Sequence, residues 1–239
     1  MNVALIFAGG VGSRMNHQAK PKQFLELHGK PIIVYTLEIF QSHAEVDAIV
    51  VVCVADWIEH MRELLTRYGL TKVVSVVEGG ATGQLSIYNG LLAIEQHYPN
   101  DTTVIIHDGV RPLIDHSIIS ANITQVQATG NAITTAPTVE TFVVVDDNMQ
   151  VQEVPSRPHS RLAKAPQSFL LGDILMVHRS AMKVGLSDVV DSCTLMHHYG
   201  HALTLVEGPV ENIKITTPTD FYIFRAIIDA REGGQIFGA

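Results

Sequence analysis

The chain has 239 residues, of which 46% are hydrophobic, and a formal net charge of −8 at pH 7. This length suits one α/β domain over residues 1–239, while the acidic balance argues against a nucleic-acid or membrane-surface partner. No apolar run approaches the roughly 18 residues of a membrane span, and the start lacks a basic leader pattern. Two isolated cysteines form no CxxC motif, so we expect both to be free thiols. We also expect a cytoplasmic protein. Because the chain is acidic and its few cations act locally, its partner should be a small anion.

The first motif, AGGVGSRMNHQAKPKQ at residues 8–23, follows a short apolar run. Gly9, Gly10 and Gly12 let backbone N–H groups converge, because glycine tolerates positive φ and has no side chain. Arg14 and Lys22 add a guanidinium and an ammonium, which together suit a polyphosphate. The spacing fits neither a Walker A loop nor G-x-G-x-x-G. The stretch is predicted to cradle a triphosphate; the alternative is an ordinary turn between a strand and a helix.

With its glycines, Arg14 and the tripeptide Pro21-Lys22-Gln23, the sequence resembles the family that joins 2-C-methyl-D-erythritol 4-phosphate cytidylyltransferase and ribitol-5-phosphate cytidylyltransferase. The resemblance runs nearly end to end. It implies that Ala8 and the loop glycines bind the nucleotide, and that Arg14 and Lys22 are catalytic.

The region after the loop alternates between helix and strand patterns. Pro31 is placed to start a helix that continues to residue 40, and Asp56 supplies an N-cap for a helix over residues 56–68. Residues 46–54 and 72–77 are nearly continuous apolar strands, typical of a parallel sheet covered on both faces. We therefore expect a Rossmann-like α/β fold whose twisted sheet is mostly parallel.

A second glycine loop, EGGATGQLS at residues 78–86, ends the third strand and precedes a helix over residues 87–96. Open α/β sheets bind ligands at the carboxyl ends of their strands. The resemblance implies that Gly80 and Ser86 hold the base and ribose. Gly83 stands where the family usually has arginine.

The fourth strand, residues 103–106, leads into HDGVRP. A carboxylate at a strand end suits Mg²⁺, which takes carboxylate, water and phosphate oxygens, so Asp108 is the candidate metal ligand. The resemblance implies that Arg111 contacts the phosphate of the acceptor. The alternative is that Asp108 caps the helix after Pro112 and pairs with Arg111.

A hairpin is expected over residues 142–154, after a helix at 118–129 and a strand at 131–137. Residues 138–160 would form a protruding β-arm whose exposed edges a second subunit covers, giving a homodimer. In the family this arm dimerises, and the turn before it reaches the acceptor site, partly across the subunit boundary. The resemblance thereby assigns acceptor contacts to Thr141 and Arg157; the alternative for Arg157 is an exposed arm cation.

The last third carries three further matches. APQSF at residues 165–169 resembles the family's TPQ-x-F motif with Ala165 in place of threonine, and helices are expected at 173–183 and after Asp191. Asp191 is either a functional residue or a helix N-cap. A strand is expected at 202–207. NIKITT at residues 212–217 then resembles the family's Asn-Ile-Lys-x-Thr motif, and the resemblance implies that Lys214, on a strand, points into the phosphate site as a catalytic cation.

Two remaining features close the chain. Thr217 and Asp220 open a last helix, which is expected to run to residue 230. The histidines at 197, 198 and 201 lack a fitting acidic partner and favour a surface over a zinc site.

Together these motifs and the family resemblance imply a cytidylyltransferase that uses CTP, Mg²⁺ and a phosphorylated polyol and releases pyrophosphate. Ribitol 5-phosphate is the favoured acceptor, because Val139 and Glu140 depart from the methylerythritol pattern. The alternatives are a 2-C-methyl-D-erythritol 4-phosphate cytidylyltransferase, a nucleotidyltransferase acting on a hexose phosphate, and an inactive nucleotide-binding module, the last motivated by Gly83 and Ala165.

Overall fold

The computed structural model describes residues 1–9 and 20–233. The main strands are β1 (Asn2–Ala8), β4 (Ala48–Cys53), β5 (Val73–Glu78), β6 (Thr103–Asp108), β7 (Asn131–Pro137), β10 (Arg161–Leu170) and β11 (Leu205–Glu207). They form one sheet in the order β11-β7-β10-β6-β1-β4-β5. The helices are α1 (Ile32–Ser42), α2 (Ile58–Arg67), α3 (Gly83–Glu95), α4 (His116–Thr129), α5 (Leu171–Lys183), α6 (Ser192–His198) and α7 (Pro218–Glu232).

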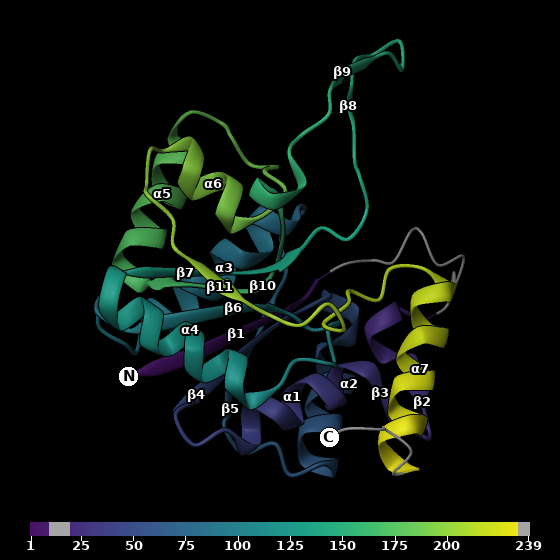
Figure 1. Ribbon diagram of the computed structural model, residues 1–239. Coiled ribbons are helices and arrows are strands. Elements are labelled where there is room, and N and C mark those ends of the chain that lie inside the picture. Colours follow the sequence, from purple (N-terminus) through teal and green to yellow (C-terminus); the bar gives the residue numbers. More distant parts are fainter. Residues whose placement is uncertain (10–19, 234–239) are drawn as a thin grey trace.

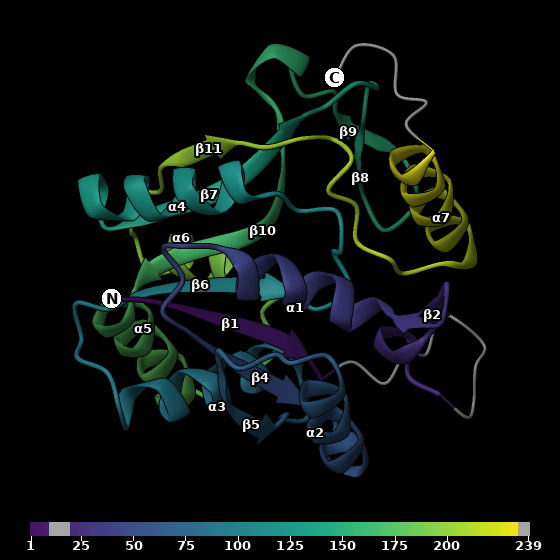
Figure 2. The same ribbon diagram turned by 90° about the horizontal axis from the view of Figure 1, so that it is seen from below.

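Helices cover both faces of this sheet (Figures 1 and 2). Along β1, Ala4 and Ile6 belong to the core shared with α1, α2 and α4, whereas Val3 and Leu5 belong to the core shared with α3, α5 and α6. All four side chains are fully buried. Because alternate residues of a strand face opposite sides, a strand covered on both sides must be apolar throughout, and this is the pattern in β1.

The expected mostly parallel α/β sheet is confirmed, with one reversed strand in the described part of the chain. β10 runs antiparallel to both neighbours, and Gln167 stands opposite Ile106 on β6 and Ile133 on β7. Residues 165–169 were noted in the sequence only as a motif, and no strand was predicted there. β10 brings these residues from the arm into the middle of the sheet.

Some helix starts differ from the prediction. α3 begins at Gly83, because the Thr82 hydroxyl caps it by accepting from the Leu85 N–H, so residues 83–86 are helical instead of a loop. Asp56 does not cap α2; it lies in the 3-10 turn η2 (Ala55–Trp57). The capping box of Thr217 and Asp220 at α7 is confirmed.

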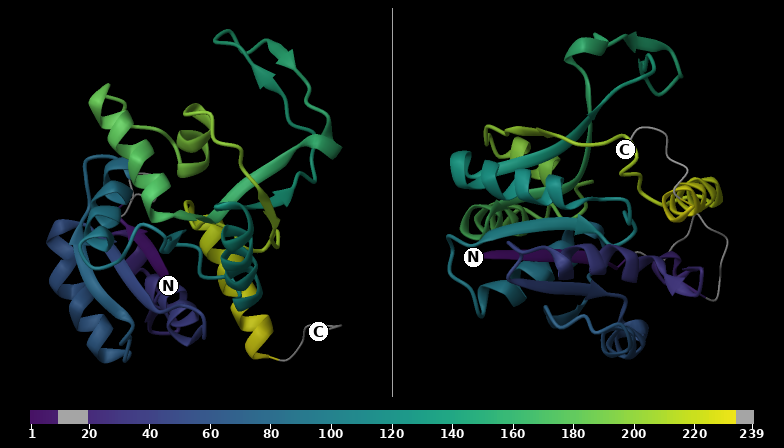
Figure 3. Two further views of the ribbon diagram at one scale, coloured as in Figure 1. Left: turned by 90° about the vertical axis from the view of Figure 1, so that its left-hand side faces the viewer. Right: turned by 60° about the horizontal axis from the view of Figure 1, so that its bottom comes forward.

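The predicted hairpin is present as β8 (Val144–Val145) paired with β9 (Val151–Glu153), followed by the 3-10 turn η3 (Arg157–His159). Figure 3 shows this arm projecting away from the sheet. Its valines are exposed, Val144 by 44% and Val151 by 56%. Their role in dimerisation stays a prediction.

Cys53 and Cys193 are free thiols, as expected. Within residues 1–9 and 20–233, no helix has the length and apolar character that crossing a bilayer requires.

Candidate active site

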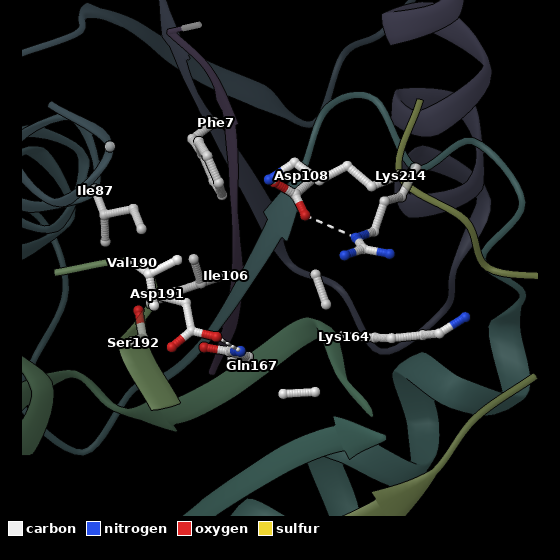
Figure 4. Close-up of a pocket in the computed structure, with 14 residues that line it drawn as sticks. Phe7, Ile87, Ile106, Asp108, Lys164, Gln167, Val190, Asp191, Ser192 and Lys214 are labelled. Carbon is white, nitrogen blue, oxygen red and sulfur yellow. Dashed lines mark hydrogen bonds and ion pairs between the residues drawn. The ribbon is translucent and has the colours of Figure 1, made fainter. Parts of the chain in front are cut away.

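The candidate site lies where β1 and β6 end side by side, with Phe7 paired in register to Asp108. From β1 the chain builds β4 and β5 on one side and places β6 on the other, which is the switch point where open α/β sheets bind ligands. A cavity of about 310 Å³ opens there. Its described lining comprises Phe7, Gly83, Ile87, Ile106, Asp108, Arg111, Ala163, Lys164, Ala165, Gln167, Val190, Asp191, Ser192 and Lys214 (Figure 4).

Asp108 forms ion pairs with two cationic side chains at one end of this cavity. Its Oδ1 lies 2.7 Å from Lys214 Nζ, and its Oδ2 lies 2.7 Å from Arg111 Nε. The side chain of Asp108 is only 7% exposed. Burial opposes ionisation of this carboxyl, but Lys214 and Arg111 outweigh that effect and lower its pKa to about 2. Asp108 is therefore ionised at neutral pH.

Part of the alternative for Asp108 holds and part does not. Arg111 does pair with Asp108, but the cap of the following helix α4 is Asp115, whose Oδ1 accepts from the Ile118 N–H at 3.0 Å. Asp108 thus remains directed at the cavity with Lys214. The Lys214 ammonium also lies 5.6 Å from the ring centroid of Phe7.

An irregular segment carries Lys214, not the strand that the sequence analysis expected. Three contacts fix it: Arg111 Nη1 donates to the Asn212 carbonyl at 2.9 Å, Asn212 Nδ2 donates to the Ala165 carbonyl at 2.7 Å, and Ile215 N–H donates to the Val110 carbonyl at 2.9 Å. Asn212 is fully buried. These bonds join β10 and the loop after β6 to the segment that presents Lys214.

Lys164, which the sequence analysis did not single out, lies beside this junction. Its ammonium donates to the carbonyl oxygens of Val210 at 2.8 Å, Asn212 at 3.3 Å and Pro209 at 3.4 Å. Burial and the positive charge of Arg111 lower its pKa. No motif would have identified this residue, because its environment is built from segments far apart in the sequence.

Gly9, directly after β1, lies beside the glycine loop that follows β5. A β-carbon at Gly9 would lie 3.0 Å from Ser86 Oγ, so Gly9 permits this close approach. Ser86 Oγ accepts from the Gly80 N–H at 3.0 Å and donates to the Thr82 carbonyl at 2.8 Å. Of the predicted nucleotide-binding residues, Ala8, Gly9, Gly80 and Ser86 are thus brought close together. Gly10, Gly12 and Arg14 lie outside the described residues.

Lys22 begins the 3-10 turn η1 (Lys22–Phe24) and is not among the lining residues of the cavity. Its neighbour Gln23 is 1% exposed and donates through Nε2 to the Ala8 carbonyl at 2.5 Å. Phe24 stacks on Trp57 with 4.7 Å between ring centroids. Gln23 therefore holds the Lys22 turn against the end of β1, a role that the sequence analysis did not assign.

The predicted acceptor contacts divide into two groups. Arg111 lines the cavity, whereas Thr141 and Arg157 are exposed on the arm, with Arg157 Nη2 3.5 Å from Thr141 Oγ1. The structure therefore pairs the two arm residues with each other and does not place them in the cavity of their own chain.

Asp191 lies in another part of the cavity, facing Gln167 (Figure 4). Its Oδ1 accepts from the Thr194 N–H at 2.8 Å, which makes it the N-cap of α6, and its Oδ2 accepts from Gln167 Nε2 at 3.0 Å. The N-cap alternative for Asp191 is thus confirmed. The same carboxylate also forms part of the cavity wall.

A magnesium ion fits this arrangement only together with a phosphorylated ligand. Within the described residues no group of three or more His, Cys, Asp or Glu side chains could hold a metal, and this includes the histidines at 197, 198 and 201. Asp108 supplies one carboxylate, whose two oxygens keep lone pairs beyond those used by Lys214 and Arg111. Mg²⁺ is commonly held by one or two carboxylates, substrate phosphates and water, so one carboxylate is compatible with it.

Comparison with known proteins gives one consistent result. A family model described as 2-C-methyl-D-erythritol 4-phosphate cytidylyltransferase matches residues 2–230. A ribitol-5-phosphate cytidylyltransferase of Streptococcus agalactiae serotype III is 58% identical, with both chains covered completely, and one of Vibrio parahaemolyticus is 57% identical with the same coverage. The crystal structure of 4-diphosphocytidyl-2C-methyl-D-erythritol synthase from Anaerococcus prevotii is 25% identical, with a TM-score of 0.81 over 95% of this chain and 96% of the other.

Proposed function

The chain belongs to the 2-C-methyl-D-erythritol 4-phosphate cytidylyltransferase family, and we propose that it transfers the cytidylyl group of CTP to D-ribitol 5-phosphate, forming CDP-ribitol and pyrophosphate. The observation that carries the acceptor is the identity of 57–58% over the whole chain to proteins named for ribitol 5-phosphate. The solved structure named for the methylerythritol reaction is 25% identical. Because the reaction needs CTP, we place the enzyme in the cytoplasm.

In the proposed reaction, a phosphate oxygen of the acceptor attacks the α-phosphorus of CTP. The new P–O bond forms as the bond between the α-phosphorus and the bridging oxygen breaks, and the electron pair leaves with pyrophosphate. The attacking oxygen is already anionic near neutral pH, so no strong general base is required. The contribution of the protein is positioning and charge neutralisation.

Cationic side chains around the cavity would neutralise the negative charge of the phosphates. Lys214, oriented by Asp108, faces the cavity, and Lys22 with Arg14 of the first glycine loop would act on the triphosphate. Ala8, Gly9, Gly10, Gly12, Gly80 and Ser86 would bind the nucleotide. Mg²⁺, held by Asp108 together with the phosphates, would supply further positive charge where negative charge develops. Donors aligned with developing charge are each worth on the order of 100-fold in rate.

The arm supports a homodimeric form of this proposal. Thr141 and Arg157 are exposed and lie outside the cavity of their own chain, while the arm carries exposed valines such as Val144 and Val151. Exposed strand edges and apolar side chains favour cover by a second chain. We infer that the arm docks on a second copy and that its Thr141 and Arg157 complete the acceptor site of that copy beside Arg111.

An assay of pyrophosphate release tests this function. Purified protein is supplied with CTP and Mg²⁺ and, in separate reactions, with ribitol 5-phosphate, 2-C-methyl-D-erythritol 4-phosphate or a hexose 1-phosphate. The highest kcat/KM is expected with ribitol 5-phosphate. A preference for the methylerythritol substrate would instead identify the protein as a 2-C-methyl-D-erythritol 4-phosphate cytidylyltransferase. Binding of CTP without release of pyrophosphate with any acceptor would favour an inactive nucleotide-binding module.

A further inference from the structure

Among the described residues that line this cavity, Lys164 is the cation that forms no ion pair. Of the three cations among the described lining residues, Arg111 and Lys214 both pair with Asp108. The Lys164 ammonium contacts the carbonyl oxygens of Pro209, Val210 and Asn212 and makes no ion pair with a described carboxylate. Glu211 is the acidic residue whose charge acts on it, and Glu211 is exposed, so solvent screens that attraction.

The structure also brings Lys164 close to a like charge. Lys164 Nζ and Arg111 Nη1 donate to the same Asn212 carbonyl oxygen, at 3.3 and 2.9 Å. The distance between the two nitrogens therefore cannot exceed the sum of these two distances. Two cations that share one neutral acceptor in a partly buried place repel each other. An anion placed between or above them would remove this repulsion and satisfy the charge of Lys164.

The chemistry of the cavity limits what this anion is. Arg111 is the described lining residue that we assign to the phosphate of the acceptor, and Lys164 adjoins it at the β10 wall, from which the arm departs. A phosphate monoester carries about −1.5 to −2 charges at pH 7 and offers three acceptor oxygens. A neutral polyol has no comparable charge. The pair formed by Arg111 and Lys164 therefore suits a phosphomonoester better than a bare sugar alcohol.

We propose that Lys164 is a specificity-determining residue that binds the phosphate of the incoming polyol phosphate, next to Arg111. This inference rests on the proposed function, since it names the part of the acceptor that Lys164 selects. A bound phosphate would take the place of the two longer carbonyl contacts, at 3.3 and 3.4 Å, and would give the ammonium an anionic acceptor, which binds a cation more strongly than a neutral carbonyl oxygen does.

If Lys164 only positioned Lys214, its loss would change the kinetics in a different way. Its bonds to residues 209–212 could serve only to position Lys214, which follows in the same segment. Loss of that role would lower kcat and leave the KM for the acceptor unchanged, because Lys214 acts on the reacting phosphates. Loss of a phosphate contact would instead raise the KM of the acceptor alone.

Steady-state kinetics of three variants separate these roles. Lys164→Met removes the charge, Lys164→Arg keeps it, and Lys183→Met removes an exposed charge outside the cavity. For Lys164→Met we expect the KM for ribitol 5-phosphate to rise about 10- to 100-fold, with kcat and the KM for CTP within about threefold of wild type. Lys164→Arg should stay within about fivefold of wild type, and Lys183→Met should match it. If Lys164→Met does not fold, Lys164→Gln replaces it, because its amide can still donate to the carbonyl oxygens.

Calorimetric titration with inorganic phosphate keeps this inference separate from the proposed reaction. Wild-type protein should bind phosphate in the millimolar range or tighter, and Lys164→Met should bind it at least 10-fold more weakly, whether or not the wild type turns over ribitol 5-phosphate. Equal phosphate binding by the two proteins would overturn the inference. A fall in kcat at an unchanged acceptor KM would overturn it too. Absence of turnover by wild type, with phosphate binding still dependent on Lys164, would count against the proposed function alone.

Discussion

Lys214 and Asp108 come from segments far apart in the chain, and their side chains meet with 2.7 Å between Nζ and Oδ1. The carboxylate is buried at the end of β6, whereas 39% of the Lys214 side chain is exposed toward the cavity. The ion pair therefore holds the Lys214 ammonium at the place where open α/β sheets bind their ligands. It is the structural basis of the catalytic role that we assign to Lys214.

Replacing Lys214 with methionine should lower kcat for cytidylyl transfer by about 100-fold or more, because one donor aligned with the developing charge is lost. The fold should persist, since a partly exposed ion pair contributes only about 0–1 kcal/mol. Pyrophosphate release at saturating substrates measures the first effect, and a thermal melt followed by circular dichroism measures the second. Lys183→Met is the control. A rate within tenfold of wild type would refute the assigned role.

Asp108→Asn should lower the free energy of unfolding by about 3 kcal/mol at pH 7, because it leaves the Arg111 guanidinium, 12% exposed, without its carboxylate. The pKa of Asp108 is lowered from 3.8 to about 2 in the folded protein. Its stabilisation is therefore complete above pH 3.8 and disappears as the pH falls through about 2.

Urea unfolding of wild type and Asp108→Asn at pH 7 and pH 3 tests this linkage. The difference between the two proteins should be smaller at pH 3 than at pH 7. An equal difference at both pH values would mean that the pKa of Asp108 is the same in the folded and the unfolded protein, contrary to the ion pairs described.

Gln23→Met keeps the approximate side-chain size but removes the amide that donates to the Ala8 carbonyl. We expect a loss of about 1–3 kcal/mol in the free energy of unfolding, since a buried hydrogen-bond acceptor is left unsatisfied. We also expect a higher KM for CTP at an unchanged KM for the acceptor, because Lys22 loses its support. Gln127→Met, at an exposed position on α4, should change stability by less than about 0.5 kcal/mol. If both variants behaved alike, Gln23 would have no special role in holding this turn.

The double variant Val144→Asp and Val151→Asp places charges on the exposed apolar side chains of the arm. We expect sedimentation velocity at micromolar concentration to show a dimer for wild type and a monomer for this variant, because interface burial of carboxylates is unfavourable. Val184→Asp, at an exposed position outside the arm, is the control and should remain dimeric. A wild-type monomer under these conditions would exclude the arm as a dimer interface.

Much of the fold could be predicted from the sequence because apolar periodicity is local. The strand expected at residues 131–137 matches β7, and the capping pattern of Thr217 and Asp220 marks the start of α7 as observed. β10 escaped prediction because its burial changes along its length, from the exposed Arg161 at the arm to the buried Phe169 in the sheet. The start of α3 was placed late because Gly83 looked like part of a loop, whereas the Thr82 cap brings it into the helix.

The site was less accessible to sequence reasoning. Asp108 was predicted from its place at the end of a strand, and Arg111 and Lys214 were found through a family resemblance; the structure brings these three together. Lys164 and Gln23 were missed, because their importance depends on carbonyl oxygens that the fold places near them. Backbone acceptors are the same in every residue, so no sequence pattern reports where they will gather.

The most direct test of the account is ³¹P NMR of a mixture of wild-type protein, CTP, ribitol 5-phosphate and Mg²⁺. The account predicts that the CTP signals decline while a diphosphate diester, CDP-ribitol, and pyrophosphate grow in equal amounts, and that the Lys214→Met protein shows this change at least 100-fold more slowly. Unchanged CTP, or CTP consumed without a diester product, would contradict it.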